Sequence, residues 1–152
     1  VKQHVGYRTV PGSGDLFSAP DCLRMLQVTG VDAVSIARGA IGNPWIFAQC
    51  RALLAGDPLP PPPDVHAQRE ALLEHWSLTE SVSGERAVVT LRKFGIKYAR
   101  LHPQHVDVRN NFAAARTAGE WHAVLERWYS VNVPGKYPQP NETQVGCVDD
   151  AP

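Results

Sequence analysis

Two short glycine-containing stretches, Gly12-Ser13-Gly14-Asp15 and Ala37-Arg38-Gly39, determine the fold predicted for this 152-residue chain. Each stretch follows a β-type run, at residues 7–10 and 31–36, and each precedes the predicted start of a helix. Backbone N–H groups in glycine-rich turns between a strand and a helix bind anions, aided by the positive end of the helix. Two such loops in consecutive βα units hold a phosphate at the end of a (β/α)₈ (TIM) barrel. We therefore predict the last two βα units of a cofactor-binding barrel.

The secondary structure around these stretches has clear predicted limits. One helix is expected to begin at Ser18, which has an acidic residue three positions later, and to end at Gly30. Residues 31–36 form a nearly continuous apolar run, which is typical of a strand covered by helices on both faces. Pro44 suits the first position of a second helix, which is expected to end at Gly56.

A run of four prolines separates this α/β half from a second half that has no convincing strand. Proline lacks an N–H group and fixes its own backbone, so residues 57–63 are predicted to form a stiff linker. Four amphipathic helices are expected beyond it and suggest a small helical bundle: residues 64–82, 85–101, 106–116 and 120–129. The predicted organisation is a barrel portion over 1–56, a linker over 57–63, a helical domain over 64–130 and a flexible tail over 131–152.

Composition excludes several classes of protein. The 15 basic and 15 acidic residues balance, so net charge indicates no partner. No apolar run reaches the roughly 20 residues that cross a bilayer, and no signal peptide opens the chain. The chain begins with Val1 and its single methionine is Met25, so we expect a piece of a longer protein. Cys22, Cys50 and Cys147 have neither disulfide-framework nor metal-site spacing, which favours a reducing cytoplasm and no bound metal.

Basic residues gather on one predicted helix of the second half. Residues 86–116 contain seven Lys or Arg and a single acid, Asp107. At about 100° per residue, a narrow stripe collects four of the cations: Arg86, Lys93, Lys97 and Arg100. This stripe is either a solvated helix face or a surface that contacts a phosphate backbone, and composition alone does not choose between them.

Three segments of the chain resemble the C-terminal part of tRNA-dihydrouridine synthases. They are Gly12-Ser13-Gly14-Asp15, the run from Ala37 to Phe47, and Leu91-Arg92-Lys93-Phe94. The resemblance extends from about residue 6 to residue 130, and its most specific part is Arg38-Gly39-Ala40-Ile41-Gly42-Asn43-Pro44-Trp45-Ile46-Phe47. The chain differs from the family pattern where Ser13 replaces Asn, Ala37 replaces Gly and Phe94 replaces His.

The resemblance implies an FMN-dependent oxidoreductase that reduces uridine in tRNA to dihydrouridine with NAD(P)H. It implies a fold in which a TIM barrel is followed by a helical tRNA-binding domain. It implies five FMN-binding residues here, Ser13, Gly14, Asp15, Ala37 and Arg38. If the basic helix is the surface that contacts a phosphate backbone, we expect four tRNA-binding residues, Arg92, Lys93, Lys97 and Arg100. The family's catalytic residues belong to earlier strands, so we expect none in this chain and no activity from it alone. Its expected partners are tRNA and the N-terminal barrel half of the same protein, in the cytoplasm and away from membranes.

Two other functions remain open at this point. The chain could belong to a non-catalytic RNA-binding protein, or to an unrelated FMN barrel oxidoreductase that acts on a small molecule. The basic helical half argues against the second of these. Asp15 also has two interpretations, because it could cap the turn that follows it or lie near a cofactor.

Overall fold

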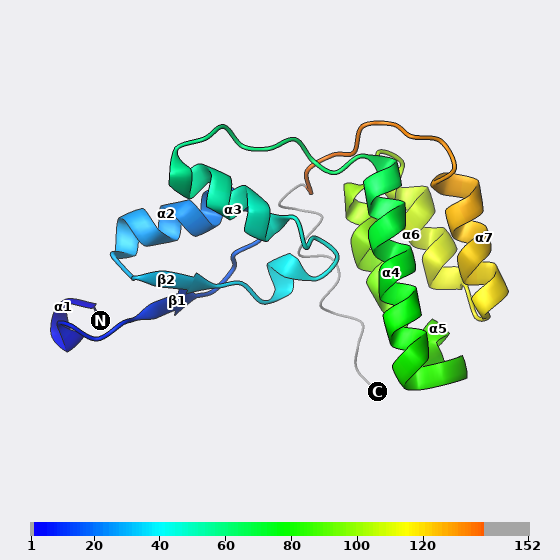
Figure 1. Ribbon diagram of the computed structural model, residues 1–152, viewed down its shortest axis with the longest axis horizontal. Helices are drawn as coiled ribbons and strands as arrows, with labels where there is room; N and C mark the ends of the chain where they lie inside the picture. The colour runs from blue at the N-terminus through cyan, green and yellow to red at the C-terminus, as the bar shows by residue number, and fades with distance from the viewer. Residues whose placement is uncertain (1, 139–152) are drawn as a thin grey trace. The chain divides into compact units, whose positions relative to one another are not determined.

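The computed structural model describes residues 2–138 and divides near Pro61 and Pro62 into two compact units, one with a small parallel sheet and one helical (Figure 1). The elements of the first unit are α1 (Lys2–Val5), β1 (Pro11–Ser13), α2 (Ala19–Thr29), β2 (Ala33–Ser35), the 3₁₀ turn η1 (Arg38–Ala40) and α3 (Ile46–Ala55). Strands β1 and β2 pair in parallel, with Gly12 opposite Val34, and α2 connects them. Helices α2 and α3 contact each other and lie on the same side of the sheet in Figure 1.

The strand predicted over residues 7–10 is shifted towards the C-terminus. Gly6 has a φ of +62° and residues 6–8 form a turn after α1, so this part of the chain cannot be extended. Pairing begins at Val10, whose N–H donates to the Asp32 carboxylate and whose carbonyl accepts from the Asp32 N–H. Gly12 and Ser13 consequently belong to β1, and the loop proper starts at Gly14.

The second strand is also less covered than its apolar sequence predicts. Ala33 and Ser35 are exposed, and only Val34 between them is partly buried. Within residues 2–61, therefore, helices cover only one face of the two-stranded sheet.

Over residues 62–138, the second unit has four α-helices at nearly the predicted positions. They are α4 (Val65–Ser83), α5 (Ala87–Tyr98), α6 (His105–Ala114) and α7 (Ala118–Trp128), with 3₁₀ turns η2 (Gly84–Arg86) and η3 (Ala99–Leu101) flanking α5. The core surrounds Trp121, which is fully buried, stacks near Trp76 with ring centroids 4.6 Å apart and donates from Nε1 to the Leu91 carbonyl. Helix α5 contacts α4, α6 and α7 and is therefore the central element of this unit.

The segment after α7 is attached to the helical unit, at least as far as it is described. The Val133 carbonyl accepts from the Val65 N–H, and the Lys136 N–H donates to the Leu101 carbonyl. The first part of the predicted flexible tail is thus hydrogen-bonded to the helices. Residues 139–152 of that predicted tail lie outside the described residues.

His102 is a buried titratable group in the core of the helical unit. Its side chain is 2% exposed, its Nε2–H donates to the Trp128 carbonyl at 2.9 Å, and its Nδ1 accepts from the Gln104 N–H at 3.0 Å. These two bonds fix the neutral tautomer. Burial lowers the pKa of His102 below its ordinary 6.5, partly opposed by the bond to Trp128.

Acidification is therefore expected to destabilise the helical unit. Below about pH 6.5 the imidazole is protonated in the unfolded chain but stays neutral in the folded protein until its lower pKa is reached. As the pH falls through this range, the free energy of unfolding therefore decreases by at most about 1.4 kcal/mol per pH unit for this group. Denaturant unfolding of wild type and His102→Gln over a pH series measures the effect. Burial also lowers the pKa of His75, so the variant should flatten the pH dependence without abolishing it. If the free energy of unfolding of His102→Gln depended on pH as strongly as that of wild type, His102 would not be a source of the effect.

Candidate functional site

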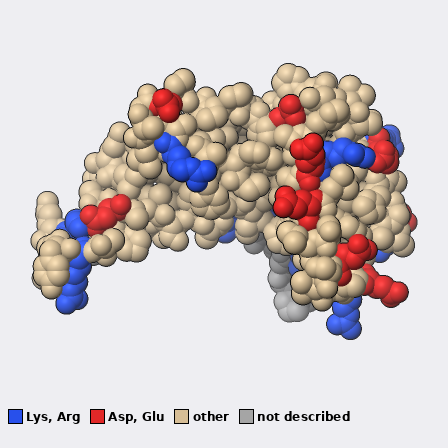
Figure 2. All heavy atoms as spheres, viewed as in Figure 1, with Lys and Arg blue, Asp and Glu red and all other residues tan. Residues whose placement is uncertain are grey.

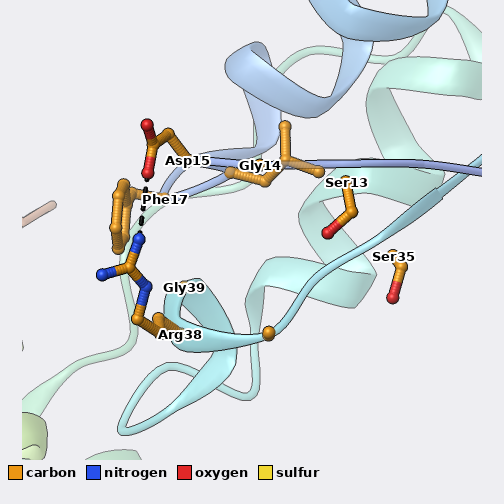
Figure 3. Close-up of a pocket in the computed structure, with 9 residues that line it drawn as sticks. Ser13, Gly14, Asp15, Phe17, Ser35, Arg38 and Gly39 are labelled. Atoms are coloured by element: carbon orange, nitrogen blue, oxygen red, sulfur yellow. Dashed lines mark hydrogen bonds and ion pairs between the residues drawn. The ribbon is translucent and has the colours of Figure 1, made fainter.

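The two loops predicted to bind phosphate leave the same edge of the sheet. Because β1 and β2 are parallel, their carboxyl ends lie side by side, and this is the edge at which α/β folds place their ligands. A cavity of about 80 Å³ opens there (Figure 3). It is lined by all five residues predicted to bind FMN and by four more: Ser13, Gly14, Asp15, Ala37 and Arg38, with Leu16, Phe17, Ser35 and Gly39.

A close backbone contact holds the two loops together. A Cβ atom added to Gly39 would lie 1.9 Å from the Leu16 carbonyl oxygen and 3.0 Å from the Phe17 Cα atom. Both neighbours are backbone atoms, which cannot move aside as a flexible side chain can. Gly39 is buried and is not among the glycines with a positive φ, so this position requires glycine for space alone.

Arg38 supplies the positive charge at the cavity. Its Nη2 atom lies 3.0 Å from Oδ1 of Asp15, and its Cζ atom lies 5.5 Å from the centroid of the Phe17 ring. Both charged side chains are largely exposed, at 59% for Arg38 and 84% for Asp15. A solvent-exposed ion pair of this kind contributes little to stability, so its role is better sought in what Arg38 can bind.

The structure gives Asp15 an ion-pair partner. The cap of α2 is Ser18, whose Oγ accepts from the Asp21 N–H, so Asp15 is not needed there. Asp15 instead pairs with Arg38, and its φ of +45° lies in the left-handed region that Asp tolerates better than most residues. Asp15 is therefore the counter-ion of Arg38 at the mouth of the cavity.

The cavity has room for a phosphate group and one cationic side chain that could bind it. Its volume is several times that needed for one water molecule, but it is smaller than the roughly 300–1,000 Å³ of pockets that enclose a whole organic ligand. An anion that enters would meet the Arg38 guanidinium and would compete there with the Asp15 carboxylate. These residues fit the phosphate end of a cofactor.

The basic residues predicted to bind tRNA follow one another along α5 and η3. Lys93 is exposed, whereas Arg92, Lys97 and Arg100 are partly buried, and the Arg100 Nε–H donates to the Lys97 carbonyl at 3.2 Å. Lys93 and Lys97 are four positions apart and share a helix face, opposite the buried Leu91. Acidic side chains gather instead over α4, on the face that Figure 2 shows.

The two cysteines that the structure describes, Cys22 and Cys50, are buried and partly buried, respectively. Cys22 lies in α2 and Cys50 in α3, and burial raises the pKa of the Cys22 thiol to about 12. A thiol held in its neutral form is a poor nucleophile and a poor metal ligand. Within residues 2–138, no group of three His, Cys, Asp or Glu side chains is arranged to hold a metal ion, and no helix has the length and apolarity to cross a membrane. Cys147 lies outside the described residues.

Sequence reasoning missed two important residues of the cavity. Phe17 is 21 positions from Arg38 in the sequence, and no local pattern indicates that its ring supports a guanidinium. Gly39 stands in a stretch predicted to bind phosphate, but its contact with the Leu16 backbone becomes visible only in three dimensions.

Comparisons with known proteins agree on one family. The family model described as dihydrouridine synthase (Dus) matches residues 1–133. A probable tRNA-dihydrouridine synthase of Mycobacterium leprae is 37% identical over 130 residues, covering 84% of this chain and 33% of the relative. The tRNA-dihydrouridine synthase B of Xanthomonas campestris is 35% identical, covering 85% of this chain and 39% of the relative, and that of Escherichia coli K12 is 29% identical, covering 85% and 40%. The chain thus spans about a third to two-fifths of the length of these relatives.

Proposed function

The chain belongs to the dihydrouridine synthase family, and from this premise we propose that it is the C-terminal portion of a flavin-dependent tRNA-dihydrouridine synthase. The whole protein would reduce uridine to 5,6-dihydrouridine in tRNA, with NAD(P)H as reductant, in the cytoplasm. The observation that carries the proposal is the family match over residues 1–133, which includes both loops and all four helices of the second unit.

In this proposal, FMN binds through its phosphate to the cavity between the two loops. Arg38 contacts the phosphate, Ser13 and Gly14 line the cavity from the β1 side, and Ala37 lines it from the β2 side. Asp15 holds Arg38 until the phosphate takes its place. When bound, FMN supplies the hydride that reduces the C5–C6 double bond of uracil. We assign no catalytic group to this chain.

The first unit supports a larger barrel in the whole protein. A two-stranded sheet is marginal by itself, and Ala33 and Ser35 leave one of its faces exposed. We propose that further βα units of the same protein pair with this sheet and complete the flavin site. The chain alone would then bind FMN weakly and be inactive.

The helical unit is proposed to bind tRNA through its phosphate backbone. Arg92, Lys93 and Lys97 of α5 and Arg100 of η3 provide the cations. Reduction of a uracil that is stacked inside the folded tRNA requires its displacement from the stack, so backbone contacts at a distance are needed to hold the substrate.

Lys97→Ala is expected to weaken binding of every tRNA by a similar factor. Losing one phosphate contact should also reduce the slope of log K against log salt concentration by about 0.7–0.9. Arg127→Ala is the matched control, because Arg127 is an exposed cation on α7 whose Cζ lies 5.1 Å from the Trp128 ring. Binding measured at several salt concentrations compares the two. If both variants behave alike, the basic residues of α5 form only a solvated face.

The function itself is tested in cells that lack the gene for this chain. Their tRNA should lose dihydrouridine at one or more positions, as measured by mass spectrometry of digested nucleosides, and the whole gene should restore it. Unchanged dihydrouridine would overturn the enzymatic proposal. If the chain still bound tRNA in that case, the non-catalytic RNA-binding alternative would take its place.

A further inference from the structure

We propose that Phe17 is the positioning residue of the phosphate site: its ring holds the Arg38 guanidinium over the cavity in the orientation that receives an anion. The proposal rests on the proposed function, because it concerns the same phosphate site. Its starting observation is the contact between the Phe17 ring and Arg38, whose Cζ lies 5.5 Å from the ring centroid. This separation is within the range of about 6 Å over which an aromatic face attracts a guanidinium.

The contacts of the guanidinium with Phe17 and with Asp15 differ in kind. Phe17 supports its position through the ring, whereas Asp15 accepts a hydrogen bond from Nη2 at 3.0 Å (Figure 3). An incoming phosphate requires the same N–H donors that Asp15 occupies, so the two anions compete. The ring does not compete, because an aromatic face attracts the cation without accepting its in-plane hydrogen bonds. Phe17 can therefore keep its hold on Arg38 after the phosphate displaces Asp15.

The backbone that carries the Phe17 ring is held by close contacts between the loops. Gly39 approaches the Leu16 carbonyl and the Phe17 Cα so closely that no side chain fits between them. Phe17 and Arg38 are consequently held on facing loops at a set separation. Phe17 itself is half-buried and lines the cavity, so its ring has less freedom than a fully exposed side chain.

Positioning matters because the Arg38 side chain is 59% exposed and long. An exposed arginine samples many rotamers in solution, and each anion it binds must first restrict them. A ring that already restricts the guanidinium lowers this entropic cost. The result is tighter binding without a hydrogen bond from Phe17 to the anion.

The test compares Phe17→Leu with Phe17→Tyr in the 152-residue chain. Leucine retains apolar volume but removes the aromatic face, whereas tyrosine retains it. NMR reports the contact directly, through the ring-current shift of the Arg38 side-chain protons, and titration with inorganic phosphate reports anion affinity from the amide signals of the two loops. We expect Phe17→Leu to abolish the ring-current shift and to weaken phosphate binding by about two- to fivefold. Phe17→Tyr should preserve both.

A second variant changes Arg38, the other partner of the contact. Arg38→Lys keeps the charge but replaces the planar guanidinium with an ammonium, so replacing Phe17 with leucine should have less effect on phosphate binding in the Arg38→Lys background. Equal phosphate affinity of wild type and Phe17→Leu, or equal losses in the Leu and Tyr variants, would overturn the positioning role. Absence of any phosphate titration in the wild-type chain would instead overturn the phosphate site itself, and this inference with it.

Discussion

Gly39→Ala is expected to disrupt the candidate site and to lower the free energy of unfolding of the first unit by about 3 kcal/mol or more. Forcing atoms into a well-packed region costs typically about 1–3 kcal/mol, and the upper end applies because the added Cβ would lie 1.9 Å from a backbone oxygen. The loops can relieve the clash only by moving apart, which carries Arg38 away from Asp15 and opens the cavity. We expect Gly39→Ala to bind phosphate more weakly as well as to be less stable.

Amide hydrogen exchange measures this effect locally, because it reports the opening of each part of a protein separately. Protection should fall in α2 and α3 of the variant and stay unchanged in α4–α7. Gly119→Ala is the matched control: nothing lies within 4 Å of the Cβ it would add in α7, so it should be neutral or stabilising by up to about 1 kcal/mol. Normal protection in Gly39→Ala would show that the loops are not held by this contact.

Several helix limits could be predicted from sequence because they depend on neighbouring residues, although α3 begins at Ile46 and not at Pro44, which lies in the preceding turn. Ser18 caps α2 through the Asp21 N–H, Gly30 ends α2 with a φ of +65°, and Asp64 caps α4 through the Ala67 N–H. Each signal lies within a few residues of the helix end that it specifies. The buried face of α5, with Leu91 and Tyr98, follows from the same local periodicity.

Contacts between distant residues account for what could not be predicted. Strand β1 begins late because Val10 pairs with Asp32, 22 positions away. The segment after α7 is rich in Pro, Gly and Asn, which is typical of a flexible tail, but the Lys136 N–H donates a hydrogen bond to the Leu101 carbonyl. The candidate site shows both cases. The parallel strands place the loops of Asp15 and Arg38 next to each other, which the sequence predicts. The ion pair between the two side chains and the contact of Arg38 with the Phe17 ring depend on three-dimensional packing.

Arg38→Ala in the whole protein should raise the dissociation constant of FMN by about ten- to 150-fold. A hydrogen bond between a cationic side chain and a phosphate contributes about 1.5–3 kcal/mol, and Arg38 is the cation that lines the cavity formed by the nine residues of the site. Asp15→Ala should change the constant much less. It removes a group that helps to hold Arg38, but it also removes the carboxylate that competes with the phosphate. Titration followed by flavin fluorescence gives the constants.

Arg24→Ala separates a specific contact with FMN from a general loss of positive charge. Arg24 belongs to the same unit, is 73% exposed and pairs with Asp21 at 2.8 Å, so it resembles Arg38 in charge, exposure and ion pairing but does not line the cavity. Its replacement should leave FMN binding within about twofold of wild type, since exposed charges away from a ligand are largely screened by salt. If Arg38→Ala were as mild as Arg24→Ala, the guanidinium would not contact the phosphate. If both lost affinity equally, the attraction would come from the overall charge of the unit rather than from the pair of loops at the strand ends.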